Sequence, residues 1–335
     1  MRVLLLDEGF VSGALTALGL QRVGCTVDVI AATGGAGECH TDAGTWRLAP
    51  KVGHPELRGL MSRQHEYDVV YPVTEPLQQL MTGSRSDKRQ TSAQMRAVGI
   101  PVPAEHSAAS ETDLRDAMRV LGTPLVVKGS VGRGGKTTFI VPSLNDACDA
   151  ANRIRALGAD PFAQAYISGV THLAGGLFDN GRALRLYCGA KRVQVPARTG
   201  PAAELVSTDD PAFADVALRV FEASRVTGLA SADFVRDERG VYHFLELNPR
   251  PWGSIAAARD AGVDLFRPLV ALWSGQSIAA DLSFRPGVRS AVFPLALLSA
   301  RCWASGAAFR SIPAPRNLRL AAHLAHRLVR VAYNW

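Results

Sequence analysis

Cysteine is scarce in this sequence, and its positions form no recognisable motif. The chain has five cysteines in 335 residues, an odd number, and no two of them show the C-x-x-C spacing. Both features argue against a disulfide framework and against a structural zinc site. Free thiols persist in a reducing compartment, so we expect a cytoplasmic protein.

Long apolar segments are also missing. No run of about 18 uncharged apolar residues occurs, and only a few apolar residues precede Asp7 and Glu8. We therefore expect neither a membrane span nor a secretory signal. The composition, 47% hydrophobic and 20% charged, is that of an ordinary globular chain that is long enough for two or three domains.

Two common nucleotide-binding motifs are absent. The glycines near the N-terminus do not form the G-x-G-x-x-G fingerprint of a dinucleotide site. A P-loop that ends at Gly135-Lys136-Thr137 would need its first glycine at the position of Ser130. The strand expected from Thr138 to Val141 also leaves no helix to receive a phosphate. The sequence therefore predicts neither kind of site.

Acidic residues are missing from residues 283–335, which contain eight arginines. Of the 37 basic side chains in the whole chain, 29 precede this segment, together with all 30 acids, so the segment carries the whole positive excess. From about residue 318, two stripes recur at helical spacing: an apolar stripe of Leu320, Leu324, Leu328 and Val331, and a basic stripe of Arg319, His323, Arg327 and Arg330. This pattern is typical of an interfacial helix.

Two interpretations of this basic tail remain open. The helix could pack on the body of the protein with its arginines in water, or it could contact an anionic membrane or an acidic partner. The second interpretation would place the protein peripherally at the inner face of a membrane. A nucleic-acid partner is not expected, because aromatic residues are few in the tail and no nucleic-acid-binding module precedes it.

The most informative segment present is the one from Ser231 to Ser254. Stretches from Ala232 to Val235 and from Val241 to Leu247 are rich in β-branched and aromatic residues, which predicts a β-hairpin. If its loop is the two-residue Arg239-Gly240, Asp233 lies directly opposite Glu246, with Cβ atoms about 5 Å apart. Two carboxylates this close repel each other unless a cation lies between them.

Asn248 and Arg250 extend the same polar group. Asn248 shares one face of the strand with Glu246, because side chains alternate along a strand. The carboxylates and the amide oxygen suit Mg²⁺, and the guanidinium of Arg250 suits anionic oxygens such as those of phosphate. The simpler alternative is an edge hairpin with solvated acids.

A second pattern places lysines beside a glycine-rich loop. The apolar strand from Leu125 ends at Lys128, and the loop that follows contains Gly132, Gly134 and Gly135. Backbone N–H groups of such a loop can bind phosphate oxygens. Upstream, Ser86-Asp-Lys88 is the predicted cap of a helix from Arg89 to Val98, and Lys88 could equally be an ordinary residue of an exposed helix.

The lysine, the glycine loop and the acidic hairpin together resemble the ATP-grasp superfamily, which includes biotin carboxylase, carbamoyl-phosphate synthase and D-alanine:D-alanine ligase. The resemblance covers about residues 1 to 290, and the run Asn248-Pro-Arg-Pro-Trp-Gly-Ser resembles most closely a bacterial subgroup of uncertain substrate. It implies that Asp233, Glu246 and Asn248 hold two Mg²⁺ ions, with Mn²⁺ as an alternative, which bridge the phosphates of ATP. It also implies that Arg250 steadies the transferred phosphoryl group and that Lys88, Lys128 and the glycine loop contact the ATP phosphates.

The same resemblance assigns the adenine site. Residues 161–169 resemble the hinge strand of the family, in which backbone groups around Ala165, Tyr166 and Ile167 read the adenine edge. Gln164 stands where an acid or a glutamine is usual. The ribose-binding glutamate that often follows is missing here, and His172 is interpreted either as its substitute or as a surface residue.

A basic pair, Lys191 and Arg192, is expected on the strand that follows a hairpin from Leu173 to Cys188. The turn signal of that hairpin is Asp179-Asn-Gly181. The pair could bind phosphates or an anionic substrate, or it could be solvated. We regard Lys191, Arg192 and Arg250 as candidate catalytic residues.

The expected fold class is α/β, with an ATP-grasp fold, an N-terminal Rossmann-like domain and a basic helical C-terminal tail. The apolar strands from Val3 to Leu6 and from Thr26 to Ala31 flank a helical stretch, which is a βαβ pattern. A third strand leads to Pro72-Val-Thr-Glu75, which is either a ligand site or a helix start. The expected boundaries are residues 1–85, 86–163 and 164–282 for three domains or subdomains, and 283–335 for the tail.

The predicted function is ATP-dependent ligation. ATP would phosphorylate a small-molecule carboxylate, and an amine or a thiol would displace phosphate from the acyl phosphate, so that ADP and phosphate are released. The alternative is a non-catalytic ATP-binding module whose tail recruits an anionic membrane or an acidic partner. A homodimer is compatible with both.

Overall fold

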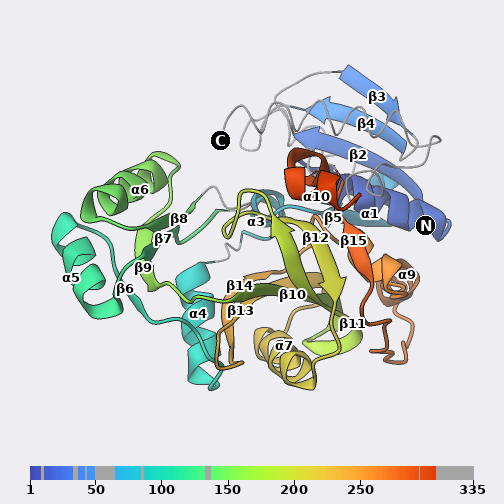
Figure 1. The fold of residues 1–335 in the computed structure, drawn as a ribbon. Helices are drawn as coiled ribbons and strands as arrows, with labels where there is room; N and C mark the ends of the chain where they lie inside the picture. Colours follow the sequence, from blue (N-terminus) through green and yellow to red (C-terminus); the bar gives the residue numbers. More distant parts are fainter. Residues whose placement is uncertain are drawn as a thin grey trace.

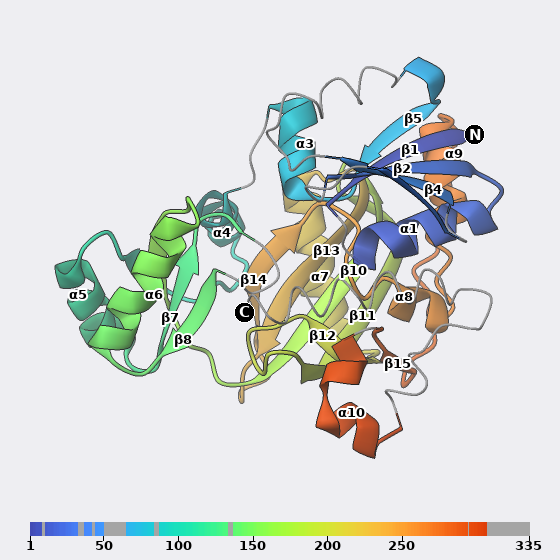
Figure 2. The ribbon, with the colours of Figure 1, turned by 90° about the horizontal axis from the view of Figure 1, so that it is seen from above.

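The computed structural model describes residues 1–8, 11–32, 37–41, 44–49, 65–83, 87–132, 137–293 and 295–306. Its strands form three sheets, of five, six and four strands (Figure 1). The five-stranded sheet is mostly parallel and the other two are antiparallel, which confirms the α/β fold class. Seen from above, the six-stranded sheet lies between the N-terminal unit and the four-stranded unit (Figure 2).

The N-terminal sheet has the order β3-β4-β2-β1-β5. Its elements are β1 (Arg2–Asp7), α1 (Val11–Arg22), β2 (Thr26–Ala32), β3 (Gly37–Thr41), β4 (Gly44–Ala49), β5 (Val69–Pro72) and α3 (Glu75–Thr82). The βαβ prediction is confirmed, because β1 pairs in parallel with β2 and β5. Four consecutive residues of β1 from Val3 to Leu6 are buried, as expected for an inner strand of a parallel sheet. Strands β3 and β4 were not predicted.

The four-stranded sheet has the order β6-β9-β7-β8. Its elements, with the helices beside it, are α4 (Lys88–Ala97), β6 (Glu105–Ser107), α5 (Glu111–Leu121), β7 (Leu125–Gly129), β8 (Thr138–Val141), α6 (Leu144–Ala156) and β9 (Pro161–Ala165). Helices α5 and α6 cover one face, where Leu125, Val127 and Ala163 form a core with them. The strand and helix predictions around the glycine loop are confirmed, and the cap of α4 is Asp87, whose Oδ1 accepts from two backbone N–H groups.

The six-stranded sheet has the order β14-β13-β10-β11-β12-β15. Its strands and the nearby helices are β10 (Val170–Asp179), β11 (Arg182–Gln194), β12 (Ala202–Ser207), α7 (Pro211–Ser224), β13 (Gly228–Arg236), β14 (Tyr242–Asn248), α8 (Ala256–Asp260), α9 (Phe266–Trp273) and β15 (Arg289–Ala291). Helix α7 covers one face with an aromatic core that includes Phe178, Phe221 and Phe234. The opposite face packs against the N-terminal unit, since Leu173 and Leu177 share a core with Val3 and Leu5.

The hairpin of β10 and β11 turns at Asn180 and Gly181, which have φ angles of 49° and 84°. Positive φ at both positions suits an Asn-Gly turn, so this prediction is confirmed. The prediction that Lys191 and Arg192 lie on the next strand is wrong. Strand β11 continues to Gln194, because Gly189 and Ala190 pair with β10 without interruption.

The hairpin of β13 and β14 differs from its prediction in one instructive way. Its loop is Asp237 to Val241 rather than two residues, and Asp237 Oδ1 accepts the N–H groups of Arg239 at 3.0 Å and Val241 at 2.8 Å. A loop of this length would put Asp233 opposite Leu245 instead of Glu246. Within this hairpin, which is described throughout, Leu245 has no pairing partner, so the strand carries a β-bulge there.

The bulge restores the predicted pairing of Asp233 with Glu246, and it also reverses the face of the sheet to which alternate side chains of β14 point. Tyr242 and Phe244, before the bulge, point into the aromatic core under α7. Glu246 and Asn248, after it, lie on the opposite face, although all four positions are even-numbered. The extra residue therefore lets one strand contribute first to the core and then to a polar site.

The end of the chain adds little to the described fold. Strand β15 pairs with β12, a 3-10 helix spans Leu295–Leu298, and α10 (Ala300–Ala304) is the last helix among the described residues. The predicted interfacial helix of the tail lies outside the described residues. Among the helices of the described part, none is long and apolar enough to cross a membrane.

Candidate functional site

Asp233 and Glu246 lie directly opposite each other on β13 and β14, on the face away from α7. Three lysines from three other elements surround them. Lys191 Nζ lies 2.8 Å from Asp233 Oδ1, and Lys88 Nζ lies 3.0 Å from Glu246 Oε2. Lys128 Nζ lies 3.5 Å from the carbonyl oxygen of Leu245, the bulge residue. The cluster therefore carries three positive and two negative side chains.

Burial and charge set the ionisation of these groups. Burial raises the pKa of Glu246, but Lys88, Lys128 and Lys191 outweigh it and hold that pKa at about 2. Burial raises the pKa of Asp233, and the ion pair with Lys191 opposes this only in part. Lys128 is 7% exposed, and burial lowers its pKa to about 8 although Glu246 opposes the shift. The lysines thus keep Glu246 ionised, and burial lets Lys128 lose its charge more easily than an ordinary lysine.

The oxygen atoms of this cluster suit Mg²⁺. Asp233, Glu246 and the amide of Asn248 offer only oxygen ligands, which a hard cation prefers. In the part of the chain that the structure describes, no group of three or more histidines, cysteines or acids gathers as a metal site. The set therefore fits an ion that takes its remaining ligands from phosphate oxygens and water rather than one held by protein alone.

Arg250 connects this hairpin to the N-terminal unit. Its Nε lies 3.1 Å from Glu75 Oε1, and its NH2 nitrogen donates to Asn248 Oδ1 at 2.8 Å. Glu75 is in the first turn of α3, so the segment after β5 is a helix start that also supplies a site contact. Gln78 on the same helix donates to the carbonyl of Pro249 at 2.8 Å. The contact between Glu75 and Arg250 had one signal in the sequence, the position of Glu75 just after β5, where ligands of open α/β sheets usually bind.

The glycine loop is described only at its ends. The backbone N–H of Lys88 donates to the carbonyl of Ser130 at 2.8 Å, which holds the start of α4 against the loop. Gly132 has φ of 130°, and a Cβ there would collide with Thr137, so glycine is required. Gly134 and Gly135 lie outside the described residues.

The predicted adenine segment lies at the end of β9. Gln164 is 1% exposed, and its Nε2 donates to Glu105 Oε1 at 3.2 Å. The N–H of Ala165 donates to the carbonyl of Ala104 at 2.8 Å. Tyr166 and Ile167 follow outside the regular strand, and their role in reading adenine stays a prediction.

Two predicted residues lie apart from the cluster. His172 is 6% exposed and faces the core under α7, where its ring meets those of Phe213 and Tyr242 edge to face at 5.2 and 5.1 Å. Burial lowers its pKa, and both interpretations, surface residue and ribose ligand, are wrong. Arg192 is exposed next to buried Lys191, and within the described structure no ion pair joins it to Asp233 or Glu246. The basic pair is therefore split, because adjacent residues of a strand face opposite sides.

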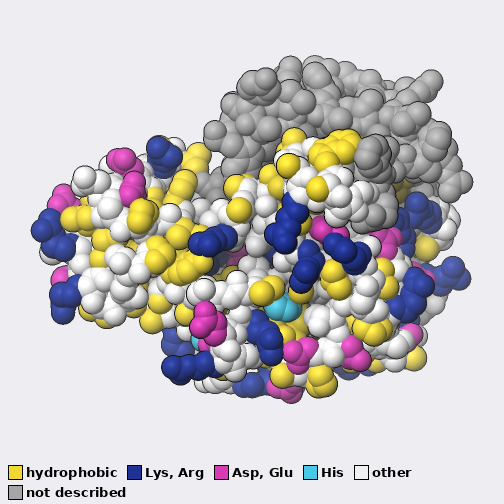
Figure 3. All heavy atoms as spheres, viewed as in Figure 1, with side chains coloured by type: hydrophobic (Ala, Val, Ile, Leu, Met, Phe, Trp, Pro, Cys, Tyr) yellow, Lys and Arg dark blue, Asp and Glu magenta, His cyan; other side chains and the backbone are white. Residues whose placement is uncertain are grey.

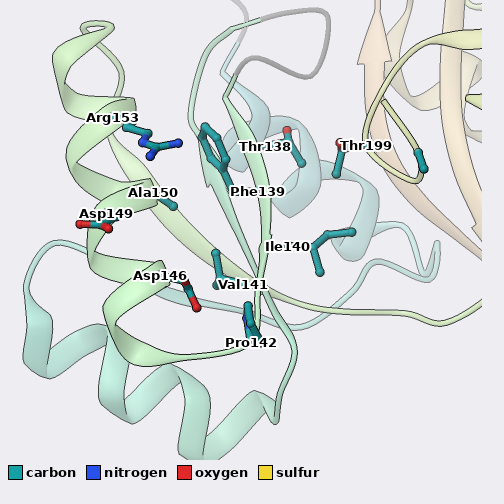
Figure 4. A pocket seen from close by; sticks show the side chains of 11 residues that line it. Thr138, Phe139, Ile140, Val141, Pro142, Asp146, Asp149, Ala150, Arg153 and Thr199 are labelled. Carbon is teal, nitrogen blue, oxygen red and sulfur yellow. The ribbon is translucent and has the colours of Figure 1, made fainter. Parts of the chain in front are cut away.

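A shallow groove of about 370 Å³ lies elsewhere, between β8, α6 and the loop that joins β11 to β12 (Figure 4). Phe139, Ile140 and Pro142 give it an apolar wall, and Figure 3 shows apolar side chains exposed on this part of the four-stranded unit. None of the predicted site residues lines it. It is distinct from the cluster of lysines and carboxylates.

Comparisons with known proteins agree with this geometry. A family model described as an ATP-grasp domain matches residues 85–254, about half of the chain. Pyruvate carboxylase of Schizosaccharomyces pombe is 24% identical over 164 residues, which cover 45% of this chain and only 14% of that protein. The chain thus spans a small part of its curated relative.

Two solved structures share the fold at low identity. The biotin carboxylase domain dimer of Hydrogenobacter thermophilus 2-oxoglutarate carboxylase, in complex with MgADP and bicarbonate, has a TM-score of 0.67 and 15% identity, over 86% of this chain and 73% of that one. N5-carboxyaminoimidazole synthetase from Staphylococcus aureus has a TM-score of 0.64 and 15% identity, over 84% of this chain and 79% of that one. These likenesses extend beyond the matched family model, because they cover 84% and 86% of the chain rather than about half.

Proposed function

Since this chain belongs to the ATP-grasp family of ATP-dependent ligases and carboxylases, we propose that it is an ADP-forming ligase that joins a carboxylate to an amine or a thiol. The observation that carries the proposal is the convergence of Lys88, Lys128 and Lys191 on the opposed pair Asp233 and Glu246. A site with this charge pattern suits a polyanion that arrives with its own metal ions. It contains no side chain that must act as a nucleophile.

In the proposed reaction, an oxygen of the acceptor carboxylate attacks the terminal phosphorus of ATP. The bond from that phosphorus to the bridging oxygen breaks, ADP leaves, and an acyl phosphate remains. The amine or thiol then attacks the acyl carbon, and phosphate leaves. Catalysis of both steps depends on positioning and on stabilisation of developing charge, which fixed cations supply.

Each residue has a role that its position supports. Lys88 and Lys128 would bind the phosphate chain, and Asp233, Glu246 and Asn248 would hold Mg²⁺, which neutralises phosphate charge when it is bound. Arg250 would face the transferred phosphoryl group, since Glu75 and Asn248 fix two of its nitrogens. Lys191 would sit beside the same group. Arg192, which is exposed, is left out of this assignment.

The names of the relatives support the acceptor chemistry. Pyruvate carboxylase is named for the addition of a carboxyl group, and the structure of the 2-oxoglutarate carboxylase domain contains MgADP and bicarbonate, the anion of a small acid. The name of the staphylococcal neighbour describes a carboxylated amine. We propose from these names that the acceptor of this chain is also a small carboxylic acid, bound between the N-terminal unit and the hairpin.

Nucleotide analysis tests the proposal. The purified chain is incubated with MgATP and pools of carboxylates and amines, and nucleotides are separated by ion exchange. ADP should accumulate only with an acceptor acid, and hydroxylamine should trap the acyl phosphate as a hydroxamate. Release of AMP in stoichiometric amount would refute the mechanism, because AMP is the product when the carboxylate attacks the α-phosphorus, as it does in an adenylating ligase. If no pool of carboxylates and amines causes ATP to be consumed, a non-catalytic ATP-binding module is favoured.

A further inference from the structure

Exposed arginines gather on the part of the body from which the basic tail departs. Arg192 is on β11, Arg198 is in the loop that joins β11 to β12, Arg289 begins β15, and Arg301 is on α10. All four are exposed, and Figure 3 shows Lys and Arg side chains gathered over this part of the molecule. This surface is named the basic face.

One small apolar cluster holds the elements of the basic face together. Val193 and Val195 at the end of β11, Ala291 of β15 and Cys302 of α10 belong to this cluster. Each of the four arginines is within three residues of one of these residues in the sequence. The arginines therefore surround the same cluster, although they come from four different segments.

The charge of the basic face is compensated only in part. Glu204 accepts a hydrogen bond from Nε of Arg289 at 3.0 Å, and its side chain is 3% exposed, whereas that of Arg289 remains 53% exposed. Arg192, Arg198 and Arg301 form no ion pair with any of the described residues. A cluster of like charges attracts a surface of the opposite charge.

Two large apolar side chains are exposed on the same face. Leu298 is 48% exposed and Trp303 is 42% exposed. Nε1 of Trp303 donates to the carbonyl of Leu297 at 2.9 Å, which fixes the indole ring beside the turn that carries Leu298. Tryptophan is enriched at membrane–water interfaces, where an apolar ring and a polar N–H are both accommodated. Arginines around exposed tryptophan and leucine are typical of a protein surface that lies on a membrane.

We propose that the basic face lies against an anionic bilayer and forms, with the tail, one continuous membrane contact. The described residues end at Gly306, directly after α10, so residues 307–335 leave the body from this face and can reach the same bilayer. Stable attachment to a membrane usually takes two signals, because each alone binds only marginally. A bilayer suits the face better than a nucleic acid, since Leu298 and Trp303 can enter its acyl boundary.

The experiment is co-sedimentation of the full chain with vesicles of phosphatidylcholine and phosphatidylserine, compared with vesicles of phosphatidylcholine alone. Arg198→Gln and Arg301→Gln should each lower the partition coefficient about fivefold, and the double variant about 25-fold, because each arginine loses its attraction to the anionic surface. Trp303→Gln keeps the charge and should also lower partitioning, by about fivefold or more, because less apolar area enters the interface.

Two substitutions on other surfaces are the matched controls. Arg115→Gln removes an arginine of α5 that is 66% exposed and pairs with Glu111 at 2.7 Å, and α5 lies well apart from α10 in both views (Figure 1, Figure 2). Leu157→Gln removes a leucine after α6 that is 60% exposed. Both should keep the wild-type partition coefficient. Thermal unfolding of every variant should match the wild type, which shows that lost binding is not lost folding.

The outcomes separate the basic face from its alternatives. Wild-type partitioning of the double arginine variant would overturn the inference, because the tail would then act alone. An equal loss in Arg115→Gln would also overturn it, since binding would then follow net charge rather than one face. A full chain that binds double-stranded DNA but not anionic vesicles at low salt would assign the face to nucleic acid instead. None of these measurements uses ATP turnover, so the proposed function is tested separately.

Discussion

The lowered pKa of Lys128 predicts that nucleotide affinity falls with rising pH in a range where few other side chains titrate. Burial holds this pKa at about 8, well below the usual value for lysine. A bound phosphate chain favours the charged form and raises the pKa further in the complex. Nucleotide affinity should therefore be nearly full at pH 7 and should decline as the pH rises through 8, because the free protein must first take up a proton.

The size of the decline follows from the protonated fraction. With a pKa of about 8, Lys128 is charged in about 90% of molecules at pH 7 and in about 10% at pH 9. The dissociation constant of MgATP should therefore rise about tenfold between these pH values, if phosphate contact keeps the bound lysine charged throughout. Titration calorimetry at constant ionic strength measures this change in the dissociation constant. The range starts at pH 7 because the second phosphate pKa is about 6, so that the phosphate itself stays ionised throughout.

Two variants decide whether Lys128 is the group responsible. Lys128→Arg keeps its charge at every pH used, so its dissociation constant should stay flat from pH 7 to 9. Lys128→Met should bind more weakly at pH 7 and should also give a flat profile. A Lys128→Met variant with the wild-type slope would refute the reasoning, because another group would then titrate. Wild-type affinity in Lys128→Met at pH 7 would refute the placement of the phosphates.

Two further predictions concern the metal ligands and the tail. Glu246→Gln should lower turnover about 10²-fold or more, because it removes the charge of a metal ligand, and it should change the affinity for adenine nucleotides by no more than a few-fold. Turnover within threefold of wild type would contradict the assignment of Glu246 as a metal ligand. Glu111→Gln, on the exposed face of α5, is the control. A chain that ends near residue 313 should keep ATP turnover but lose co-sedimentation with anionic vesicles, and binding of the full chain should weaken with salt. A full chain that does not sediment with such vesicles at low salt would leave the tail without a membrane role.

Local patterns in the sequence were sufficient for much of the fold. The βαβ unit, the strand that ends at Lys128 and the Asn180-Gly181 turn each have a signal in a short stretch of sequence, and the structure confirms all three. The opposition of Asp233 and Glu246 was predicted correctly from an incorrect loop. The bulge at Leu245 compensated for the one-residue shift of register that the longer loop causes, and period-2 alternation has no signal for such an insertion.

Contacts between distant segments could not be predicted in this way. The continuation of β11 that brings Lys191 to Asp233 depends on small residues that pair with β10. The burial of His172 depends on rings from α7 and β14. The pairing of Glu105 with Gln164 joins two strands that are separated by two helices and two other strands. Each of these depends on tertiary packing that no short window of sequence contains.

The two contacts between α3 and the segment after β14 mean that the ATP-binding half is not an autonomous module. Glu75 and Gln78 belong to the N-terminal unit, yet they hold the guanidinium of Arg250 and the backbone at Pro249. A recombinant chain that starts at residue 87 would lose both contacts, together with the apolar side chains of β1 that cover Leu173 and Leu177. N-terminal units could be exchanged between relatives as a route to new acceptors. Such an exchange would succeed only when the new α3 carries an acid at the position of Glu75 and an amide at the position of Gln78, so that the contacts to Arg250 and Pro249 are kept.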